Sequence, residues 1–370
     1  MSYINSLSQT LFLQSAIKTQ NQQLSILQQI IASGGQKAQD FSGFTPSVGD
    51  FDLRTRGAIS RNSAYMNTIS TLSTRTQGIE TALTSVDSEV NNLANTITQL
   101  NAQDPTGSAV RQTASDTLNQ VISQLNTTSD GVPLFSGVAT NTTNAPSFPI
   151  AASNTIESLL TPANLSAEAA TLGVNYPFGS GAGATPASAA ADADSVVTAI
   201  FNNPANTSTW FVPGAAGVPA APAQVADDQS IQASVTANPN IPANGTNTFG
   251  TAIKDTLAAV AAVATLTPAN FSNQADYDQF LVTQIGQINT ASSEINSAVA
   301  VNGVVRGELG TAQTTNDTST NLLQQSVDTN EVQDVATSVT NLQNLQTQLQ
   351  ATYQVTAQLK GLSLANFLPA

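Results

Sequence analysis

The chain has 370 residues, 40% of them hydrophobic, and it contains neither cysteine nor histidine. Disulfides, zinc fingers and Ser-His-Asp or Cys-His triads are therefore excluded, and we expect neither a bound metal nor a cofactor. The net charge of −14 lies entirely after residue 111, because residues 1–111 hold 7 basic and 7 acidic side chains, and such an acidic surface excludes nucleic acid as a partner by repelling its phosphates.

The amino-terminal stretch 1–36 has helical periodicity and only one charged side chain, Lys18. Its apolar residues Leu24, Leu27 and Ile31 step by three and four, which predicts a first helix that ends near residue 32. No basic segment precedes the apolar residues and no cleavage site is clear, so the sequence by itself indicates a cytoplasmic protein or one exported without a cleaved signal peptide. No apolar run approaches the roughly 20 residues of a membrane span, and we expect no membrane insertion.

A second long helix is predicted from about residue 51 to residue 100, where apolar residues again follow helical spacing. Four arginines lie along it: Arg54, Arg56, Arg61 and Arg75. Their spacing from nearby aspartates favours salt bridges along or between helices of one chain. A sharper hypothesis is that Arg54 or Arg61 forms a salt bridge with an acidic residue of a neighbouring subunit.

Asp104 and Pro105 suit the start of a third helix, with Asp104 as its N-cap, that continues to about residue 127. From residue 139 to 248 the chain is rich in Ala, Gly, Pro, Asn and Thr. Because such residues favour turns between short strands, we interpret this stretch as a compact, mainly β domain. Helical periodicity then returns at about residue 249 and continues to the end of the chain.

The predicted fold class is mainly α: a long antiparallel helical bundle built from both chain ends, with a β-rich domain inserted in the middle. The five expected segments are an N-terminal assembly helix and loop (1–45), the N-terminal part of the bundle with a hairpin (46–138), the inserted outer domain (139–248), the C-terminal part of the bundle (249–330) and a C-terminal assembly helix (331–370).

The last stretch, 335–370, again has only one charged side chain, Lys360. A solvated coiled coil normally places Glu and Lys beside its apolar seam, whereas both terminal stretches are flanked by Gln, Asn, Ser and Thr. We therefore predict self-association, because neutral side chains can be buried without desolvating ions. The predicted assembly residues are Leu24, Leu27, Ile31, Val335, Val339, Leu342, Val355, Leu359, Leu362, Leu364, Phe367 and Leu368. An ordinary bundle within one chain is the alternative interpretation.

Paired carboxylates can serve as acid and base in a hydrolase, and three pairs occur here. They are Asp192 with Asp194, Asp227 with Asp228, and Asp276 with Asp278. Each pair lies in a polar stretch without an obvious hydrophobic pocket that could raise one pKa, and no ligand loop of the EF-hand type is present. We interpret these acids as exposed or helix-capping residues, and we expect no catalytic residue and no enzymatic activity.

Three segments resemble one known family. The closing segment Gly361–Leu368, the Gln-rich helix before it (Glu331 to Ala351), and the turn at Leu125–Gly131 that leads into Leu134–Gly137 are similar to the corresponding segments of the bacterial flagellin family, and within it of the hook-associated protein 3, or hook–filament junction, branch. In that family the last helix lines the inside of a tube.

The resemblance implies a structural subunit of the bacterial flagellum that adapts hook to filament. It also implies export through the flagellar type III apparatus, an extracellular location, and contacts with copies of itself, with flagellin and hook-associated proteins, and with an export chaperone. A filament-forming flagellin is an alternative. An alternative from another class is a secreted carbohydrate- or surface-binding protein that acts through its middle domain.

Overall fold

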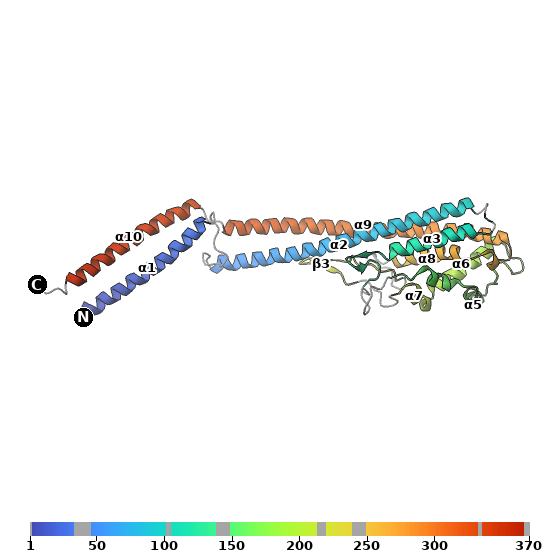
Figure 1. Ribbon diagram of the computed structural model, residues 1–370, viewed down its shortest axis with the longest axis horizontal. Helices are drawn as coiled ribbons and strands as arrows, with labels where there is room; N and C mark the ends of the chain where they lie inside the picture. Colours follow the sequence, from blue (N-terminus) through green and yellow to red (C-terminus); the bar gives the residue numbers. More distant parts are fainter. Residues whose placement is uncertain are drawn as a thin grey trace. The chain divides into compact units, whose positions relative to one another are not determined.

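The computed structural model of the chain describes residues 2–32, 46–100, 104, 106–137, 149–212, 220–238, 249–331 and 335–365. Within these ranges the chain forms ten α-helices and two two-stranded sheets, so the fold is mainly α, as the sequence predicts (Figure 1). None of the helices in these ranges combines the length and the hydropathy that a membrane span requires.

The four longest helices come from the two ends of the chain. They are α1 Ser2–Ala32, α2 Pro46–Leu100, α9 Gln274–Glu331 and α10 Val335–Ala365. The predictions of helices that end near residues 32 and 100 are confirmed. Helix α2 continues through Gly57 and Gly78, because a single glycine inside a helix costs only about 1 kcal/mol.

The chain forms two compact units. Unit 1 consists of Met1–Ala64 and Thr315–Ala370, and unit 2 is Tyr65–Thr314. The start of α2 and the end of α9 therefore belong to unit 1, and the remainder of both helices belongs to unit 2. The inserted stretch lies in unit 2 together with the helices that precede and follow it.

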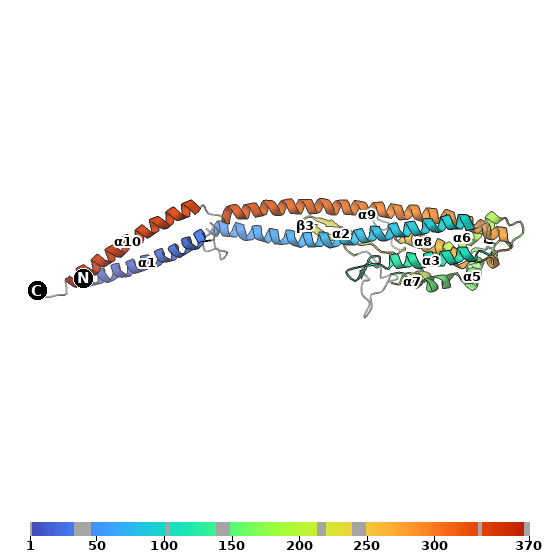
Figure 2. The ribbon, with the colours of Figure 1, turned by 45° about the horizontal axis from the view of Figure 1, so that its top comes forward.

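In unit 1, α1 packs along α10 and the two helices run in opposite directions (Figures 1 and 2). The buried residues of this pair include Ile30 from α1 and Leu345 and Leu349 from α10. Elsewhere in unit 1, the side-chain amide of Asn62 in α2 donates a hydrogen bond to the hydroxyl of Thr320 in α9, with an N–O distance of 3.4 Å.

In unit 2, hydrogen bonds fix the register between α2 and α9. The amide of Asn302, which is buried, donates to the backbone carbonyl of Thr76 with an N–O distance of 2.7 Å. Ten residues earlier in α9, the hydroxyl of Ser292 donates to the carboxylate of Asp87 in α2. Because later residues of α2 bond to earlier residues of α9, the two helices are antiparallel here. Buried polar contacts of this kind specify register, since a slip would leave them unpaired.

The main core of unit 2 lies around α8, Phe249–Thr265, which packs against α3, Ser108–Leu125. Twelve of the 17 residues of α8 are buried, because Ala, Val, Ile and Leu occur on all sides of this helix. The same continuous core also contains apolar residues of α2, of α9 and of the inserted stretch 139–248, which we call the insert. The insert is therefore packed into the helical part of unit 2.

Where it is described, the stretch 139–248 is mostly helical, and the prediction of a mainly β domain is wrong for these residues. Its helices are α4 Ser153–Glu157, the 3-10 helix η1 Ser158–Leu160, α5 Pro162–Leu172, α6 Pro186–Asn202 and α7 Pro204–Trp210. Prolines that suggested turns are instead the first residues of α5, α6 and α7, each preceded by a capping Thr161, Thr185 or Asn203. Alanine, common in this stretch, also has the highest helix propensity.

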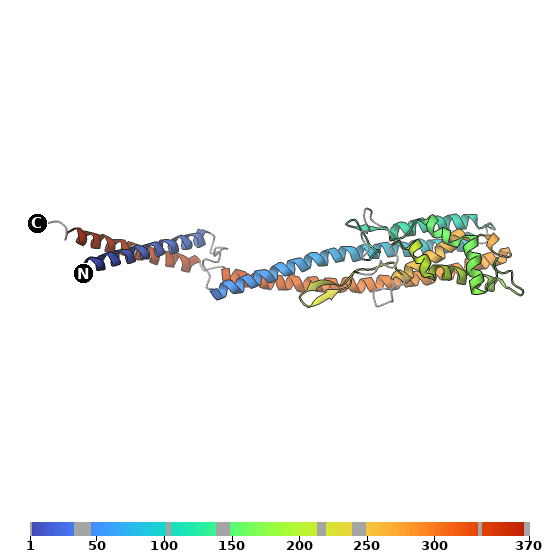
Figure 3. The same ribbon diagram turned by 90° about the horizontal axis from the view of Figure 1, so that it is seen from below.

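The two sheets are short antiparallel hairpins. One pairs β1 Thr128–Ser129 with β2 Val132–Pro133, and the other pairs β3 Ala223–Ala226 with β4 Gln229–Ile231. The second hairpin covers parts of α2 and α9 (Figure 3) and buries Val225 and Ile231 against Ile69, Val305 and Leu309. It therefore forms a second, smaller core of unit 2.

The insert is also bonded to the connection between α8 and α9, which contains the 3-10 helix η3 Pro268–Asn270. The backbone N–H of Phe178 donates to the carbonyl of Asn270 at 2.9 Å, and the N–H of Ser272 donates to the carbonyl of Phe178 at 2.8 Å. The ring of Phe178 packs against that of Phe271, with centroids 5.6 Å apart. This contact places the following residue, Gly179, against the start of α9.

Helix α3 begins later than predicted. Its N-cap is Gly107, which has a positive φ of 63°, and Asp104 does not occupy the N-cap position. The carboxylate of Asp104 nevertheless accepts a hydrogen bond from the backbone N–H of Ala109 at 2.7 Å, in the first turn. Asp104 thus satisfies a free helix N–H from outside the helix.

Candidate assembly surfaces

The pair formed by α1 and α10 in unit 1 is the first candidate surface. Helix α1 carries only Lys18 and α10 only Lys360 as charged side chains. The hydroxyl of Ser338 is buried without a hydrogen-bond partner among the described residues. Burying such neutral groups costs far less free energy of desolvation than burying ions, so another protein segment can cover these helices with little desolvation penalty.

The structure brings several predicted assembly residues to this pair. Those half-buried within the single chain are Leu24, Leu27, Ile31, Val339 and Leu342. Val355 is 47% exposed. The side chains of Val335, Leu359, Leu362 and Leu364, and residues Phe367 and Leu368 altogether, lie outside the described part of the chain.

Among the side chains of α1 and α10 that the structure describes, the buried apolar ones were not predicted as assembly residues. They are Ile30, Leu345 and Leu349, each less than 9% exposed. The signal was present, because Leu345 and Leu349 continue the spacing of three and four from Leu342, and Ile30 lies three residues after Leu27. Spacing gives the apolar stripe but does not say which members of it face the partner helix of the same chain.

A groove of about 440 Å³ runs between α1 and α10. It is lined by aliphatic and amide side chains: Gln23, Ile26, Leu27, Ile30, Asn341, Asn344, Leu345 and Gln348. None of these side chains carries a charge, so the groove suits a helix with the same neutral composition.

Large apolar side chains are also exposed on unit 1. Phe51 and Leu53 near the start of α2 are 49% and 56% exposed, Leu322 of α9 is 62% exposed, and Tyr353 of α10 is 51% exposed. Single exposed apolar residues are normal. In unit 1, however, they occur together with the nearly uncharged helices α1 and α10, and exposed apolar side chains can mark a surface that another protein covers.

The arginines of α2 mostly have partners within the chain. Arg54 pairs with Asp50 and Arg56 with Asp52, each at 2.9 Å and four residues apart. The prediction of salt bridges along the helix is confirmed for these two. Arg61 is exposed and also makes a polar or electrostatic contact.

Arg75 bonds to the first hairpin, whereas Arg54 and Arg56 pair with aspartates of their own helix. Its guanidinium donates to the backbone carbonyls of Pro133 and Leu134, at 3.2 and 3.4 Å. Burial lowers the pKa of Arg75, and the nearby charge of Asp130 opposes this shift. Arg75 therefore fastens the first hairpin to α2.

The second candidate surface is the outer face of α2 in unit 2. Between residues 67 and 99, every exposed side chain is Ser, Thr, Asn or Gln: Asn67, Ser70, Thr71, Ser73, Thr74, Gln77, Thr81, Thr84, Ser88, Asn92, Asn95, Thr98 and Gln99. The charged residues of the same stretch are partly buried. The surface of a well-behaved soluble domain carries about 25–35% charged residues, so this uncharged face is one that protein can cover without desolvating ions.

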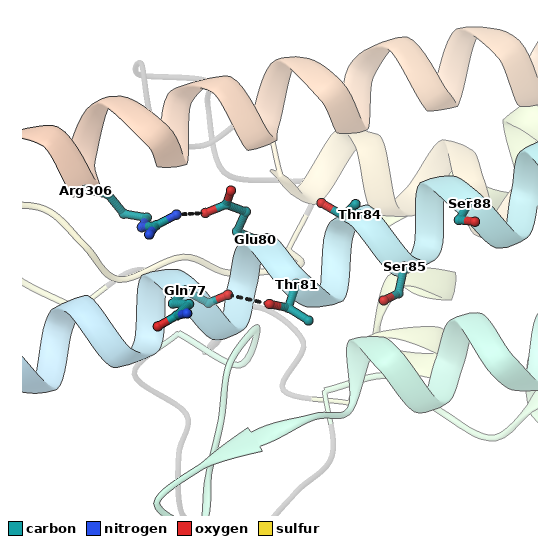
Figure 4. A pocket seen from close by; sticks show the side chains of 7 residues that line it. All are labelled: Gln77, Glu80, Thr81, Thr84, Ser85, Ser88 and Arg306. Carbon is teal, nitrogen blue, oxygen red and sulfur yellow. Dashed lines mark hydrogen bonds and ion pairs between the residues drawn. The ribbon is translucent and has the colours of Figure 1, made fainter.

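A groove of about 430 Å³ lies on this face, beside α9 (Figure 4). It is lined by Gln77, Glu80, Thr81, Thr84, Ser85, Ser88 and Arg306. Glu80 and Arg306 form an ion pair in which the two charges cancel. The hydroxyl of Thr81 donates to the backbone carbonyl of Gln77 at 3.0 Å and so is already satisfied within its own helix. The groove is polar and has no net charge.

The acidic pairs do not gather into one site, and their interpretation as exposed or helix-capping residues is wrong for Asp194, which is half-buried within α6 and whose pKa is raised by burial. Asp194 accepts hydrogen bonds from two glutamines of α9, Asp227 accepts one from Tyr65 at 2.9 Å, and Asp276 is buried beside Asn273. In the described ranges, no three His, Cys, Asp or Glu side chains are grouped so that they could hold a metal ion.

A scan against models of protein families found no match to this chain, and a search of curated proteins found no significant relative.

Proposed function

We propose that the chain is a structural, non-enzymatic subunit that associates with copies of itself through α1, α10 and the outer face of α2. The observation that supports this most directly is the lack of charge on α1 and α10, each of which has a single lysine over 31 residues. Copies of a chain with a net charge of −14 repel one another. Contacts made through uncharged faces limit that repulsion and avoid the desolvation of ions.

In the proposed assembly, the terminal helices pack with those of neighbouring copies into the wall of a tube, within an antiparallel bundle built from both chain ends. The predicted seam residues Leu24, Leu27, Leu342 and Val355 retain exposed apolar surface that neighbours can cover. Arg54 is 79% exposed in its ion pair, so it can exchange this partner for an acid of an adjacent subunit at little cost.

We further propose that this assembly is the hook–filament junction of the bacterial flagellum. The similarity of Gly361–Leu368, and of the Leu125–Gly131 turn with Leu134–Gly137, to that branch of the flagellin family supports the assignment. The proposed partners are further copies of the chain, flagellin and other hook-associated proteins outside the cell, and an export chaperone inside it.

Deletion of the gene, followed by electron microscopy of the cells and of the shed material, tests this function. The junction role predicts hooks without filaments and flagellin released into the medium. Normal flagella on the deletion strain would rule out both the junction and the filament roles. Long tubes formed by the purified chain alone would favour a filament flagellin instead.

A further inference from the structure

The hairpin of β3 and β4 packs in a small core of its own, over α2 and α9 (Figure 3). Its buried side chains Val225 and Ile231 lie against Ile69 of α2 and against Val305 and Leu309 of α9. This small core shares no buried residue with the main core around α8. The hairpin is thus held to the two long helices by an apolar cluster separate from the one that holds the rest of the insert.

Just after β4, the chain passes from the small core into the main core. Ala233 is buried in the small core, whereas Val235 and Ala237 are buried in the main core. Ala237 is also fixed through its backbone, because its N–H donates to the carbonyl of Phe135 at 2.8 Å. Val235 and Ala237 therefore anchor one end of the hairpin, and Ser234 is the residue at which the chain leaves the main core.

Hydrogen bonds within the hairpin close its base. The hydroxyl of Ser234 accepts from the backbone N–H of Ala220 at 2.9 Å, and the side-chain amide of Gln232 donates to the carbonyl of Ala220 at 2.7 Å. These bonds join the two ends of the segment 220–234 and involve no group of α2 or α9. The hairpin can therefore move away from the helices as one piece, with these bonds intact.

The polar bond between the tip of the hairpin and α2 is exposed to solvent. The hydroxyl of Tyr65 donates to the carboxylate of the exposed Asp227 at 2.9 Å. Because water competes for such a bond, it contributes less free energy than the burial of Val225 and Ile231. The attachment of the hairpin to the helices therefore depends chiefly on the small core.

The hairpin also completes the apolar contact between α2 and α9. Met66, Ile69 and Leu72 recur every three residues along α2 and pack in the small core, as do Val305 and Leu309 of α9. Two helices alone leave part of such apolar rows in water, and the hairpin is the third element that covers them. With the hairpin in place, Ile69 and Leu309 are each only 1% exposed.

We propose that the β3–β4 hairpin is a strap, anchored in the main core, that opens and closes over α2 and α9 while the rest of unit 2 stays folded. Closed, it forms one cooperative unit with residues 66–72 of α2 and 305–312 of α9. Open, it uncovers the apolar strip that these two helix segments share. Because the small core is separate from the main core, opening the strap requires only a part of the free energy of global unfolding.

Hydrogen–deuterium exchange of the dilute full chain, resolved by residue, tests the strap. The amides of β3, β4 and the two helix segments should exchange through one opening, at least about 100-fold faster than the slowest amides of α8. Val260→Ala, at a fully buried position of α8 in the main core, should accelerate exchange in α8 at least about tenfold and leave the strap amides within about twofold of the wild type.

Val225→Ala is the matched variant in the small core. It should accelerate both sets of amides, because a less stable closed strap makes local opening and global unfolding both easier. Slower exchange in α8 alone, with the strap amides unchanged, would contradict the assignment of Val225 to the strap contact.

Equal acceleration of both sets in Val260→Ala would overturn the proposal, because the hairpin would then open only together with the main core. Exchange of residues 66–72 and 305–312 at the rate of α8 would also overturn it, since these helix segments would then not depend on the strap. If Val260→Ala does not fold, the urea dependence of exchange in the wild-type chain decides the matter. Strap opening exposes little surface and must respond weakly to urea, whereas a response equal to that of α8 would contradict it.

Discussion

The contact between the insert and the start of α9 depends on a glycine, and this gives a sharp prediction about stability. Gly179 has a φ of +83°, and a Cβ atom at this position would lie 2.3 Å from Oδ2 of Asp276 and 3.0 Å from Cβ of Ala189. Asp276 is only 2% exposed and its carboxylate accepts a hydrogen bond from Asn273 at 2.8 Å. Gly179→Ala must therefore displace a buried, hydrogen-bonded carboxylate.

The expected cost has two parts. The left-handed backbone costs an alanine about 1–2 kcal/mol, and the displaced carboxylate with its lost hydrogen bond costs about 1–3 kcal/mol more. Gly183 is a matched control, because it has a φ of +77° in the same insert but no atom within 4 Å of its Cβ position. Gly183→Ala should therefore cost only the backbone part.

Urea unfolding followed by the fluorescence of Trp210, which is buried in the same unit, measures both variants. We expect Gly179→Ala to reduce the free energy of unfolding by about 1–3 kcal/mol more than Gly183→Ala does. If the two variants agree within about 0.5 kcal/mol, the collision with Asp276 is not real and the described packing of the insert against α9 is wrong.

Two further predictions concern unit 2. Asn302→Ala removes the buried hydrogen bond to the carbonyl of Thr76. Urea unfolding should therefore show a free energy of unfolding lower by about 1–2 kcal/mol. For the control Asn296→Ala, at an exposed position of the same helix, the decrease should be less than about 0.5 kcal/mol. The hydrogen bond from the hydroxyl of Thr106 lowers the pKa of Asp104. Asp104 therefore stabilises the fold above its ordinary pKa of 3.8, and this contribution disappears as the pH falls through the lowered pKa. The urea midpoint of Asp104→Asn should consequently change less between about pH 6 and about pH 3 than that of the wild type.

Periodicity predicted the long helices because their apolar residues recur every three or four positions over many turns, which a strand or loop cannot imitate. The insert was misread because its prolines follow Thr161, Thr185 and Asn203, and a Thr-Pro or Asn-Pro pair can begin either a turn or a helix. The alanines that follow the pairs favour the helix, and they are most numerous after the first two.

The contact between Asp194 and α9 could not be predicted from the sequence. Asp194 was recognised only as a member of a pair with Asp192, whereas Gln284 and Gln287, which donate hydrogen bonds to its carboxylate, are 90 and 93 residues further along the chain. Such a contact is created by the packing of the insert against α9, and no local pattern reports it. The apolar stripes of α1 and α10 were easier to predict, because the residues of each stripe are close in sequence and share one helix face.

Self-association through the terminal helices is tested most directly by disulfide cross-linking, since the chain has no cysteine of its own. Val355→Cys places a thiol on α10, and Leu172→Cys places one at the end of α5 in the insert; the native side chains are 47% and 44% exposed. In the concentrated full chain under mild oxidation, we expect covalent dimers of Val355→Cys at least about tenfold more abundant than those of Leu172→Cys, a difference of about 1.4 kcal/mol in effective association. Equal yields, or no cross-link at Val355→Cys, would contradict assembly through α10.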